Sequence, residues 1–129
     1  MVRRRPRPDT LRDLVLGILS ERGEPLTVPQ LTELLREKGR TVSPGAVFRA
    51  IRDLIDRGAA RKIWVARAYA AAPGGFTIGL YCRQCGSLHD ADGGVAYAAL
   101  SSLAETHGFK ASIYIVEAPG LCHRCASSI

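Results

Sequence analysis

Two short motifs contain all four cysteines of this 129-residue chain. The first runs from Cys82 to Cys85 and the second from Cys122 to Cys125, and each has the spacing Cys-x-x-Cys. Thiolates are soft ligands, and a gap of two residues lets both sulfurs of one tight turn reach the same ion. Four such sulfurs suit a tetrahedral Zn²⁺ with no open coordination position. The spacing therefore predicts one structural zinc ion per chain, which joins the second motif to the middle of the sequence.

Two disulfides or a redox Cys-x-x-Cys are the alternative uses of these cysteines. No stretch resembles a secretory signal, which favours a reducing compartment and disfavours disulfides. A thioredoxin-like site needs one pair on a βαβ unit, whereas this chain has two matched pairs. A closed four-sulfur site also leaves no coordination position for a substrate. The sequence has no Ser-His-Asp set and no phosphate-binding glycine loop, so we expect no enzymatic activity.

The charge of the chain is concentrated in its first half. The net charge is +6, and 47% hydrophobic with 23% charged residues is typical of a globular protein. Residues 1–73 contain 15 basic and 8 acidic residues, whereas residues 74–129 contain 3 and 4. A basic first half suits a polyanion such as double-stranded DNA. No apolar run is long enough to cross a membrane, and we expect a cytoplasmic protein without a membrane partner.

Three short helices are expected in the basic half. Each begins at a capping residue and ends near a glycine: Asp9 or Thr10 to Gly23, Thr27 to Gly39, and Ser43 to Gly58. Apolar residues recur at helical spacing in all three segments. Arginines of the third helix, Arg49 and Arg52, fall outside its apolar stripe. Three helices of this kind, with a basic third helix, predict a helix-turn-helix.

Two short strands at 59–65 and 67–70 are expected to follow as the hairpin, or wing, of a winged helix-turn-helix. Arg61 and Lys62 of this hairpin are candidates for contacts with phosphates. Trp64, the only tryptophan, is expected to pack the wing onto the helices. The winged-helix domain is predicted to span residues 9–72, after a flexible basic arm at residues 1–8 that suits salt-dependent contacts with DNA.

The second half is predicted to be a small α/β dimerisation domain at residues 77–129, joined by a glycine-rich hinge at residues 73–76. Its expected elements are strands at 77–81 and 87–90, a helix at 93–107, a strand at 110–117, and a turn that leads into the second cysteine pair. Open sheet edges favour pairing with a second copy of the chain. The fold class is therefore α+β, with a winged helix-turn-helix followed by a dimerisation domain with a Cys₄ zinc site.

This order of parts resembles the ferric uptake regulator superfamily. The sequences FTIGLYCRQCGSL, HGFK and EAPGLC are similar to its zinc uptake regulator branch, and SPGAVFR from Ser43 to Arg49 is similar to the start of the family's recognition helix. The resemblance implies a homodimeric, metal-responsive transcription regulator, most often a repressor, that binds inverted-repeat operators. It also implies that the four cysteines hold structural zinc, that Arg49 contacts DNA, and that Phe48 takes the place of a DNA-contacting tyrosine. The candidate DNA-binding residues are Ser43, Phe48, Arg49, Arg52, Arg61 and Lys62.

The chain departs from the family where the family usually senses metal. Members usually carry histidines just before the first cysteine pair, but residues 74–81 contain no histidine and no carboxylate. Imidazoles and carboxylates are what an exchangeable site for zinc or iron needs, so the usual hinge sensor is predicted to be missing. His89, Asp90 and Asp92 form a possible second metal site, and a solvated turn is the alternative reading of the same residues.

A second function class remains open at this point. A zinc-knuckle module that heterodimerises with a complete paralogue, with weak or no specific DNA binding, would have the same cysteine spacing. The first hypothesis predicts double-stranded DNA and a second copy of the chain as partners, and neither hypothesis requires a small-molecule substrate. Binding to an inverted-repeat operator separates the two.

Overall fold

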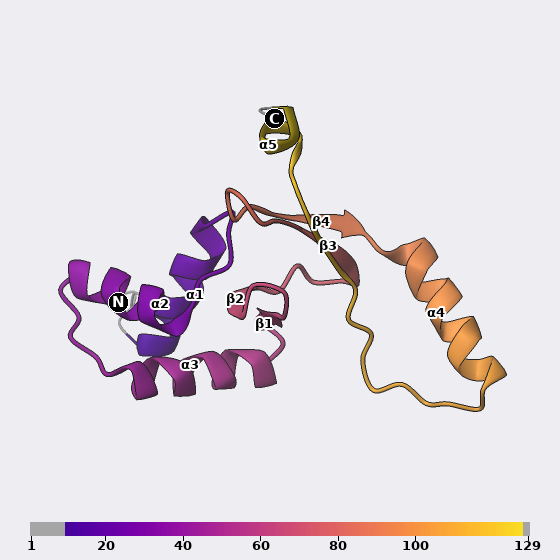
Figure 1. Cartoon of the computed structure of the whole chain (residues 1–129). Coiled ribbons are helices and arrows are strands. Elements are labelled where there is room, and N and C mark those ends of the chain that lie inside the picture. Colours follow the sequence, from indigo (N-terminus) through magenta and orange to yellow (C-terminus); the bar gives the residue numbers. More distant parts are fainter. Residues whose placement is uncertain (1–9, 128–129) are drawn as a thin grey trace, which may run out of the picture. The chain divides into compact units, whose positions relative to one another are not determined.

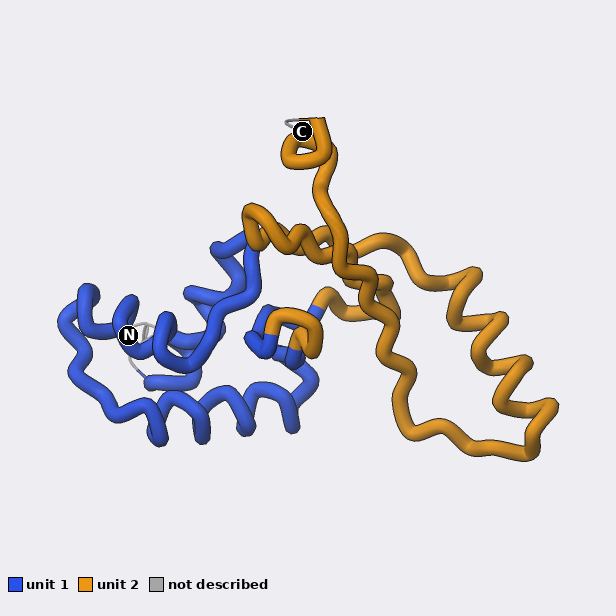
Figure 2. The backbone as a smooth tube through the Cα atoms, in the orientation of Figure 1, with its two compact units in different colours: residues 1–62, 67–72 blue, residues 63–66, 73–129 orange. Residues whose placement is uncertain are grey.

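The computed structural model of the protein describes residues 10–127, so the predicted arm at residues 1–8 and Asp9 lie outside the described part. The described chain divides into two compact units (Figures 1 and 2). Unit 1 comprises the residues up to Lys62 together with Arg67–Ala72, and unit 2 comprises Ile63–Ala66 and the residues from Pro73 onward. The elements are α1 (Leu11–Glu21), α2 (Val28–Glu37), α3 (Pro44–Asp56), β1 (Ala60–Ile63), β2 (Ala68–Ala71), β3 (Thr77–Cys82), β4 (Leu88–Asp92), α4 (Gly94–Thr106), β5 (Glu117–Gly120) and α5 (His123–Ser127).

The three helices of unit 1 begin where capping chemistry predicts. The Thr10 hydroxyl accepts the Asp13 N–H at 3.2 Å, and the Ser43 hydroxyl accepts the Ala46 N–H at 3.1 Å. Thr27 forms a full capping box in which its own N–H donates to the side chain of Gln30 at 2.8 Å. These bonds satisfy donors that the first helical turn leaves free, so the local sequence fixes where each helix starts.

One apolar core holds these helices together. Its buried members come from α1, α2, α3, the segment before α2 and the first residue of β1: Val15, Ile18, Leu19, Leu26, Leu31, Leu35, Val47, Ile51, Leu54 and Ala60. Leu31, Leu35, Val47 and Ile51 are completely shielded from solvent. The helical stripes predicted from the sequence therefore form the core of unit 1, and α3 is anchored along its inner face.

A two-stranded sheet of β1 and β2 follows α3, as the predicted wing requires. Leu26 extends this sheet, because its N–H and C=O each bond the backbone of Tyr69 at 2.8 Å. The turn between the strands contains Arg67, the only non-glycine residue of the described chain with a positive φ, at 51°. The predicted strand at 59–65 is shortened to Ala60–Ile63, and the predicted strand at 67–70 is shifted by one residue to Ala68–Ala71, because this turn takes up Trp64 to Arg67.

Unit 2 is built on a three-stranded sheet with the order β4-β3-β5. The β3 and β4 strands pair antiparallel, with Thr77 opposite Asp92, and β3 and β5 pair parallel, with Cys82 opposite Gly120. The α4 helix follows β4, and none of its thirteen residues is buried. None of the described helices is both long and apolar enough to cross a membrane.

The expected strand at 110–117 is wrong, because the strand lies instead at Glu117–Gly120. The isoleucine- and valine-rich segment before it has no partner strand within the described chain, and the side chains of Ile113 and Ile115 are 72% and 52% exposed. A β-rich composition indicates only that a segment fits a sheet, and the hydrogen bonds still need a neighbour. The free edge of β3 is taken by β5, and Pro119 is tolerated there because β5 is an edge strand.

The side chain of Trp64 is 54% exposed, so its indole ring is not a core residue. Within unit 2, the Glu117 carboxylate accepts the backbone N–H groups of Trp64 and Val65, both at 2.9 Å. The backbone of this turn is therefore held by a carboxylate and not by burial of the indole ring.

Candidate metal centre and nucleic-acid interface

The first cysteine pair forms a tight turn at the end of β3. Cys82 is buried as the last residue of the strand, and its N–H donates to the Ser87 carbonyl at 2.9 Å. Gly86 closes the turn, because its N–H donates to the Cys82 carbonyl at 2.9 Å while its φ is +79°. A positive φ costs little only for glycine, so the residue after the second cysteine is part of the knuckle.

The second cysteine pair is brought to the same place by β5. Gly120 pairs with Cys82, and its carbonyl accepts the Arg83 N–H at 2.9 Å. Cys122 follows Gly120 after one intervening residue, and the short α5 helix carries Cys125. Because β5 is parallel to β3, both strands deliver their cysteine pairs at the same end of the sheet.

The four sulfurs form one cluster. All four lie within 4.8 Å of one another, and this is the only group of three or more potential metal ligands found among the described residues. The sulfurs of Cys85 and Cys122 are 3.8 Å apart, well beyond a disulfide bond of about 2.05 Å. A tetrahedral ion with metal–sulfur distances of about 2.3 Å would place its sulfurs about 3.8 Å apart. The cluster therefore fits one tetrahedral thiolate-bound ion, as the Cys-x-x-Cys spacing predicts.

These thiols have different pKa values because their surroundings differ. The backbone N–H of Cys85 and then that of Cys122 lower the pKa of Cys82 to about 5. The backbone N–H of Cys125 is the main cause that lowers the pKa of Cys122. Hydrogen bonding with the Cys122 sulfur, followed by burial, raises the pKa of Cys125 to about 12. Because metal ligands must be thiolates, an ion that binds here has to displace protons, and Cys125 holds its proton most firmly.

The possible second metal site at His89, Asp90 and Asp92 lies on β4. Asp90 and Asp92 are two positions apart and share one face of the strand, whereas His89 is directed to the opposite face. The Asp90 carboxylate accepts the Thr77 hydroxyl at 3.1 Å, and the Asp92 carboxylate accepts the Gly94 N–H at 3.2 Å. The strand geometry does not gather the imidazole and the two carboxylates around one point.

The outer face of α3 carries three of the candidate DNA-binding side chains. Phe48 is 40% exposed, and Arg49 and Arg52 are exposed. The Arg52 guanidinium lies over the Phe48 ring, 5.9 Å from its centroid. Ser43 is exposed at the start of the helix, where its hydroxyl is used as the cap. The structure thus brings these four residues together on one helix, opposite the buried face of Val47 and Ile51.

The remaining candidates, Arg61 and Lys62, are half-buried on β1.

A salt bridge fixes α3 against α1, because the Arg12 guanidinium bonds the Asp53 carboxylate at 2.7 Å. Arg57 contacts the same carboxylate at 3.2 Å. The hydrogen bond from Arg12 is the main cause that holds the pKa of Asp53 below its usual value.

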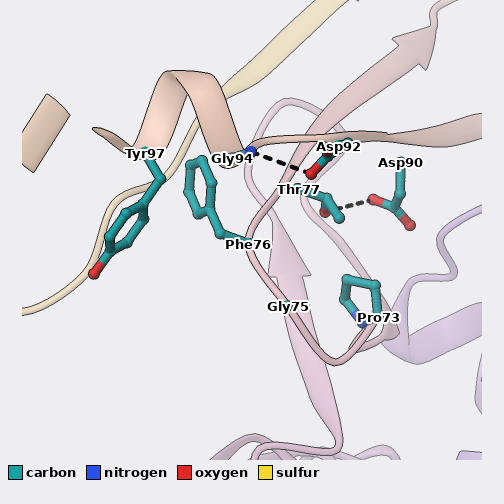
Figure 3. Close-up of a pocket in the computed structure, with 8 residues that line it drawn as sticks. All are labelled: Pro73, Gly75, Phe76, Thr77, Asp90, Asp92, Gly94 and Tyr97. Atoms are coloured by element: carbon teal, nitrogen blue, oxygen red, sulfur yellow. Dashed lines mark hydrogen bonds between the residues drawn. The ribbon is translucent and has the colours of Figure 1, made fainter. Parts of the chain in front are cut away.

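A groove in unit 2 was not predicted from the sequence. It is lined by residues from the segment before β3, the sheet and the start of α4: Pro73, Gly75, Phe76, Thr77, Asp90, Asp92, Gly94 and Tyr97 (Figure 3). The sequence assigns its carboxylates only to the possible metal site with His89. Side chains alternate between the two faces of a strand, so Asp90 and Asp92 lie on one face of β4. This alternation is the sequence feature that could have indicated that the two carboxylates lie together.

Sequence comparison identifies relatives across most of the chain. The zinc uptake regulation protein of Escherichia coli K12 is 26% identical over 116 residues, which cover 86% of this chain and 68% of that protein. The protein of the same name from Shigella flexneri matches equally well. No family model matches the chain.

Structural comparison agrees with these matches. A zinc uptake regulator complexed with zinc and DNA superimposes with a TM-score of 0.84 at 25% identity, covering 95% of this chain and 85% of that chain. The holo form of a second zinc uptake regulator, XcZur, gives a TM-score of 0.80 at 26% identity, covering 96% and 89%. The ferric uptake regulator of Helicobacter pylori, at 18% identity and a TM-score of 0.68, shares the fold.

Proposed function

Because the chain is a Zur-like member of the ferric uptake regulator superfamily, we propose that it is a DNA-binding transcription regulator, acting as a homodimer on inverted-repeat operators and most simply as a repressor. One Zn²⁺ per chain is held by Cys82, Cys85, Cys122 and Cys125. This zinc closes unit 2 and performs no chemistry. Regulation of transcription is consistent with a cytoplasmic protein and with the absence of enzymatic activity.

The outer face of α3 is the observation that carries this proposal. A helix whose inner residues are completely buried is rigidly held, and its outer face offers an aromatic ring and two guanidinium groups. Arginine forms bidentate hydrogen bonds with guanine in the major groove and also anchors phosphates. Phe48 can pack on a thymine methyl group. With its N-terminal cap, its buried inner face and its exposed arginines, α3 has the features of a recognition helix in a winged helix-turn-helix.

The exposed apolar surface of unit 2 supports a homodimer. Several large apolar side chains of α4 and the segment after it are exposed in the single chain: Val95, Leu103, Phe109, Ile113 and Ile115. Among the described residues from Pro73 onward, only Gly79, Cys82, Gly93 and Cys125 are buried. A unit with so few buried residues gains stability when a second copy covers its apolar surface. A two-fold dimer would also present two α3 helices to two half-sites.

A mobility-shift titration with the protein's own promoter region tests DNA binding. Replacing Arg49 with alanine should weaken binding by about 5- to 150-fold if the guanidinium contacts a base, since such a pair is worth about 1–3 kcal/mol. Arg36→Ala is the matched control, because Arg36 is an exposed arginine on α2 and its loss removes the same charge. Binding should also weaken steadily with added salt.

An absent shift with every inverted repeat tried would favour the zinc-knuckle adaptor over the regulator. Equal losses of affinity in Arg49→Ala and Arg36→Ala would mean that only net charge attracts DNA.

Zinc content measured by atomic absorption tests whether the hinge sensor is missing. One zinc per chain agrees with a missing hinge sensor, whereas a second zinc that mild chelation removes would contradict it.

A further inference from the structure

The outer face of α3 carries two guanidinium groups whose charge is not neutralised within unit 1. Arg49 and Arg52 are exposed, and neither forms a salt bridge with a residue of the described chain. The Asp53 carboxylate, one turn after Arg49, instead bonds Arg12 at 2.7 Å and Arg57 at 3.2 Å. Both guanidinium groups on this face can therefore bond an acceptor outside the chain.

The side chain of Arg52 is directed back along the helix. Its guanidinium carbon lies 5.9 Å from the centroid of the Phe48 ring, which belongs to the residue four positions earlier. The electron-rich face of an aromatic ring attracts a cation, and long side chains on a helix lean toward its N-terminus. Phe48 thus holds the Arg52 charge nearer to the start of α3, the part of a recognition helix that contacts base edges.

The side chain of Arg49 is directed the same way. Its Nη1 atom lies 3.6 Å from the place that a Cβ atom of Gly45 would occupy, and Gly45 is also four positions earlier. The two guanidinium groups therefore lie beside residues 45 and 48, which are three residues apart. With a rise of about 1.5 Å per residue, this corresponds to about 4.5 Å along the helix axis.

This spacing is close to the distance between neighbouring base pairs of DNA. One step along the duplex is about 3.4 Å and two steps are about 6.8 Å, so a separation of about 4.5 Å is nearer to one step. Guanine offers two acceptors, O6 and N7, in the major groove, and a guanidinium group bonds both at once. Two guanidinium groups held at this spacing suit guanines in two adjacent base pairs.

We propose that Phe48 is a positioning residue, which holds the Arg52 guanidinium beside that of Arg49 so that α3 reads two adjacent guanine-containing base pairs in each half-site. This inference rests on the proposed function and deepens it, because it names the bases that are read. Arg49 and Arg52 contact the guanines, and Phe48 acts on the second guanine through Arg52.

Selection from a library of duplexes with randomised half-sites, followed by affinity measurements, tests the proposal. The wild-type protein should enrich two adjacent guanine-containing pairs in each half-site, and Arg52→Ala should enrich only one of them. On the duplex selected by the wild type, Arg52→Ala should bind about 5- to 150-fold more weakly. Replacing the guanine assigned to Arg52 with 7-deazaguanine removes its N7 acceptor. This change should weaken wild-type binding and leave binding by Arg52→Ala unchanged.

Variants of Phe48 test its positioning role. Phe48→Leu keeps an apolar side chain and removes the ring, so it should weaken binding about 2- to 5-fold, the worth of an exposed cation–π contact, and relax the Arg52 position. Phe48→Tyr should restore both the affinity and the guanine preference. Arg36→Ala removes an exposed guanidinium from α2 and should keep both guanine preferences. Circular dichroism should show unchanged helix content, because none of the replaced side chains is buried.

Three results would overturn the inference and leave the proposed function standing. They are selection of a single guanine-containing pair by the wild type, retention of both preferences by Arg52→Ala, and equal relaxation by Arg36→Ala. A Phe48→Leu protein that keeps both guanine preferences but no longer distinguishes thymine from uracil would overturn it too, because the ring would then contact a methyl group directly. Failure of the wild type to enrich any sequence would overturn the proposed function together with this inference.

Discussion

Replacing Cys122 with serine tests how unit 2 is held together. This cysteine lies two residues after the end of β5, and its sulfur lies 3.8 Å from that of Cys85. Serine keeps the size of the side chain but supplies no soft ligand for zinc. The second cysteine pair then has only Cys125, so the connection between β5 and the β3 knuckle is weakened. We expect the variant to bind less than one zinc per chain and to lose the structure of unit 2.

The expected size of the effect follows from the scarcity of buried residues in unit 2. A domain of about sixty residues has a total stability of about 3–9 kcal/mol, at roughly 0.05–0.15 kcal/mol per residue. Zinc binding to small thiolate-containing domains contributes about 10–16 kcal/mol. One sulfur is a quarter of the ligand set, and a quarter of that contribution is about 2.5–4 kcal/mol, a large part of the stability expected for a domain of this size. We therefore expect loss of one sulfur to destabilise unit 2 strongly.

Hydrogen exchange followed by mass spectrometry measures the two units separately. Amides of β3 should exchange much faster in Cys122→Ser than in the wild type, and chelation of the wild-type protein should produce the same change. Amides of α2 and α3 should keep their protection, because the core of unit 1 contains no residue of the metal cluster. Ser87→Ala is the control, since it removes a hydroxyl 3.1 Å from the Cys85 sulfur and leaves all four sulfurs in place.

Retention of one zinc per chain in Cys122→Ser, with unchanged exchange in β3, would refute this reasoning. Equal loss of protection in α2 and α3 would refute a different part of it, because unit 1 would then depend on the metal. A Ser87→Ala protein that loses zinc would show that the hydroxyl, and not the sulfur count, decides binding.

Three further predictions concern unit 1. Leu31→Ala should lower the free energy of unfolding of unit 1 by about 2–5 kcal/mol, measured by urea titration, because the side chain is completely buried and its loss leaves a cavity. Ser43→Ala should cost about 1 kcal/mol through loss of the α3 cap and should shift the same titration by that smaller amount. Asp53→Asn should lower stability at neutral pH and remove part of its acid dependence. The folded protein lowers the pKa of Asp53, so its contribution is complete above the unfolded pKa and is lost as the pH falls through the folded value. Unfolding curves of wild type and variant should therefore converge in acid, and a constant difference at every pH would exclude the contribution of the Arg12 ion pair.

The helices of unit 1 could be predicted because their signals are local. Thr27 and Gln30 are three residues apart, and their reciprocal hydrogen bonds need no other part of the chain. The apolar stripes of α1 to α3 likewise depend only on helical periodicity. The cysteine cluster could be predicted for a similar reason, since two matched Cys-x-x-Cys pairs satisfy one tetrahedral ion with few alternatives.

Features of unit 2 that depend on pairing could not be predicted in the same way. The composition of residues 110–117 predicts a strand, but the position of the observed strand is decided by which segment pairs with the free edge of β3. The groove was missed because Phe76 and Tyr97 are brought together only by the packing of α4 after β4. The turn at Trp64 could not be predicted because its backbone hydrogen bonds come from Glu117, a residue more than fifty positions away.

The distance between the two cysteine pairs along the chain also sets an order of events during synthesis. Cys85 and Cys122 are 37 positions apart, and a ribosome adding about 5–20 residues per second needs about 2–7 s to cover that interval. The amino-terminal helical bundle can fold in this period, whereas the first thiol pair waits for its counterpart with no closed site to protect it. A nascent chain that stalls before Cys122 therefore carries a folded unit 1 joined to an incomplete unit 2 that cannot retain a metal ion.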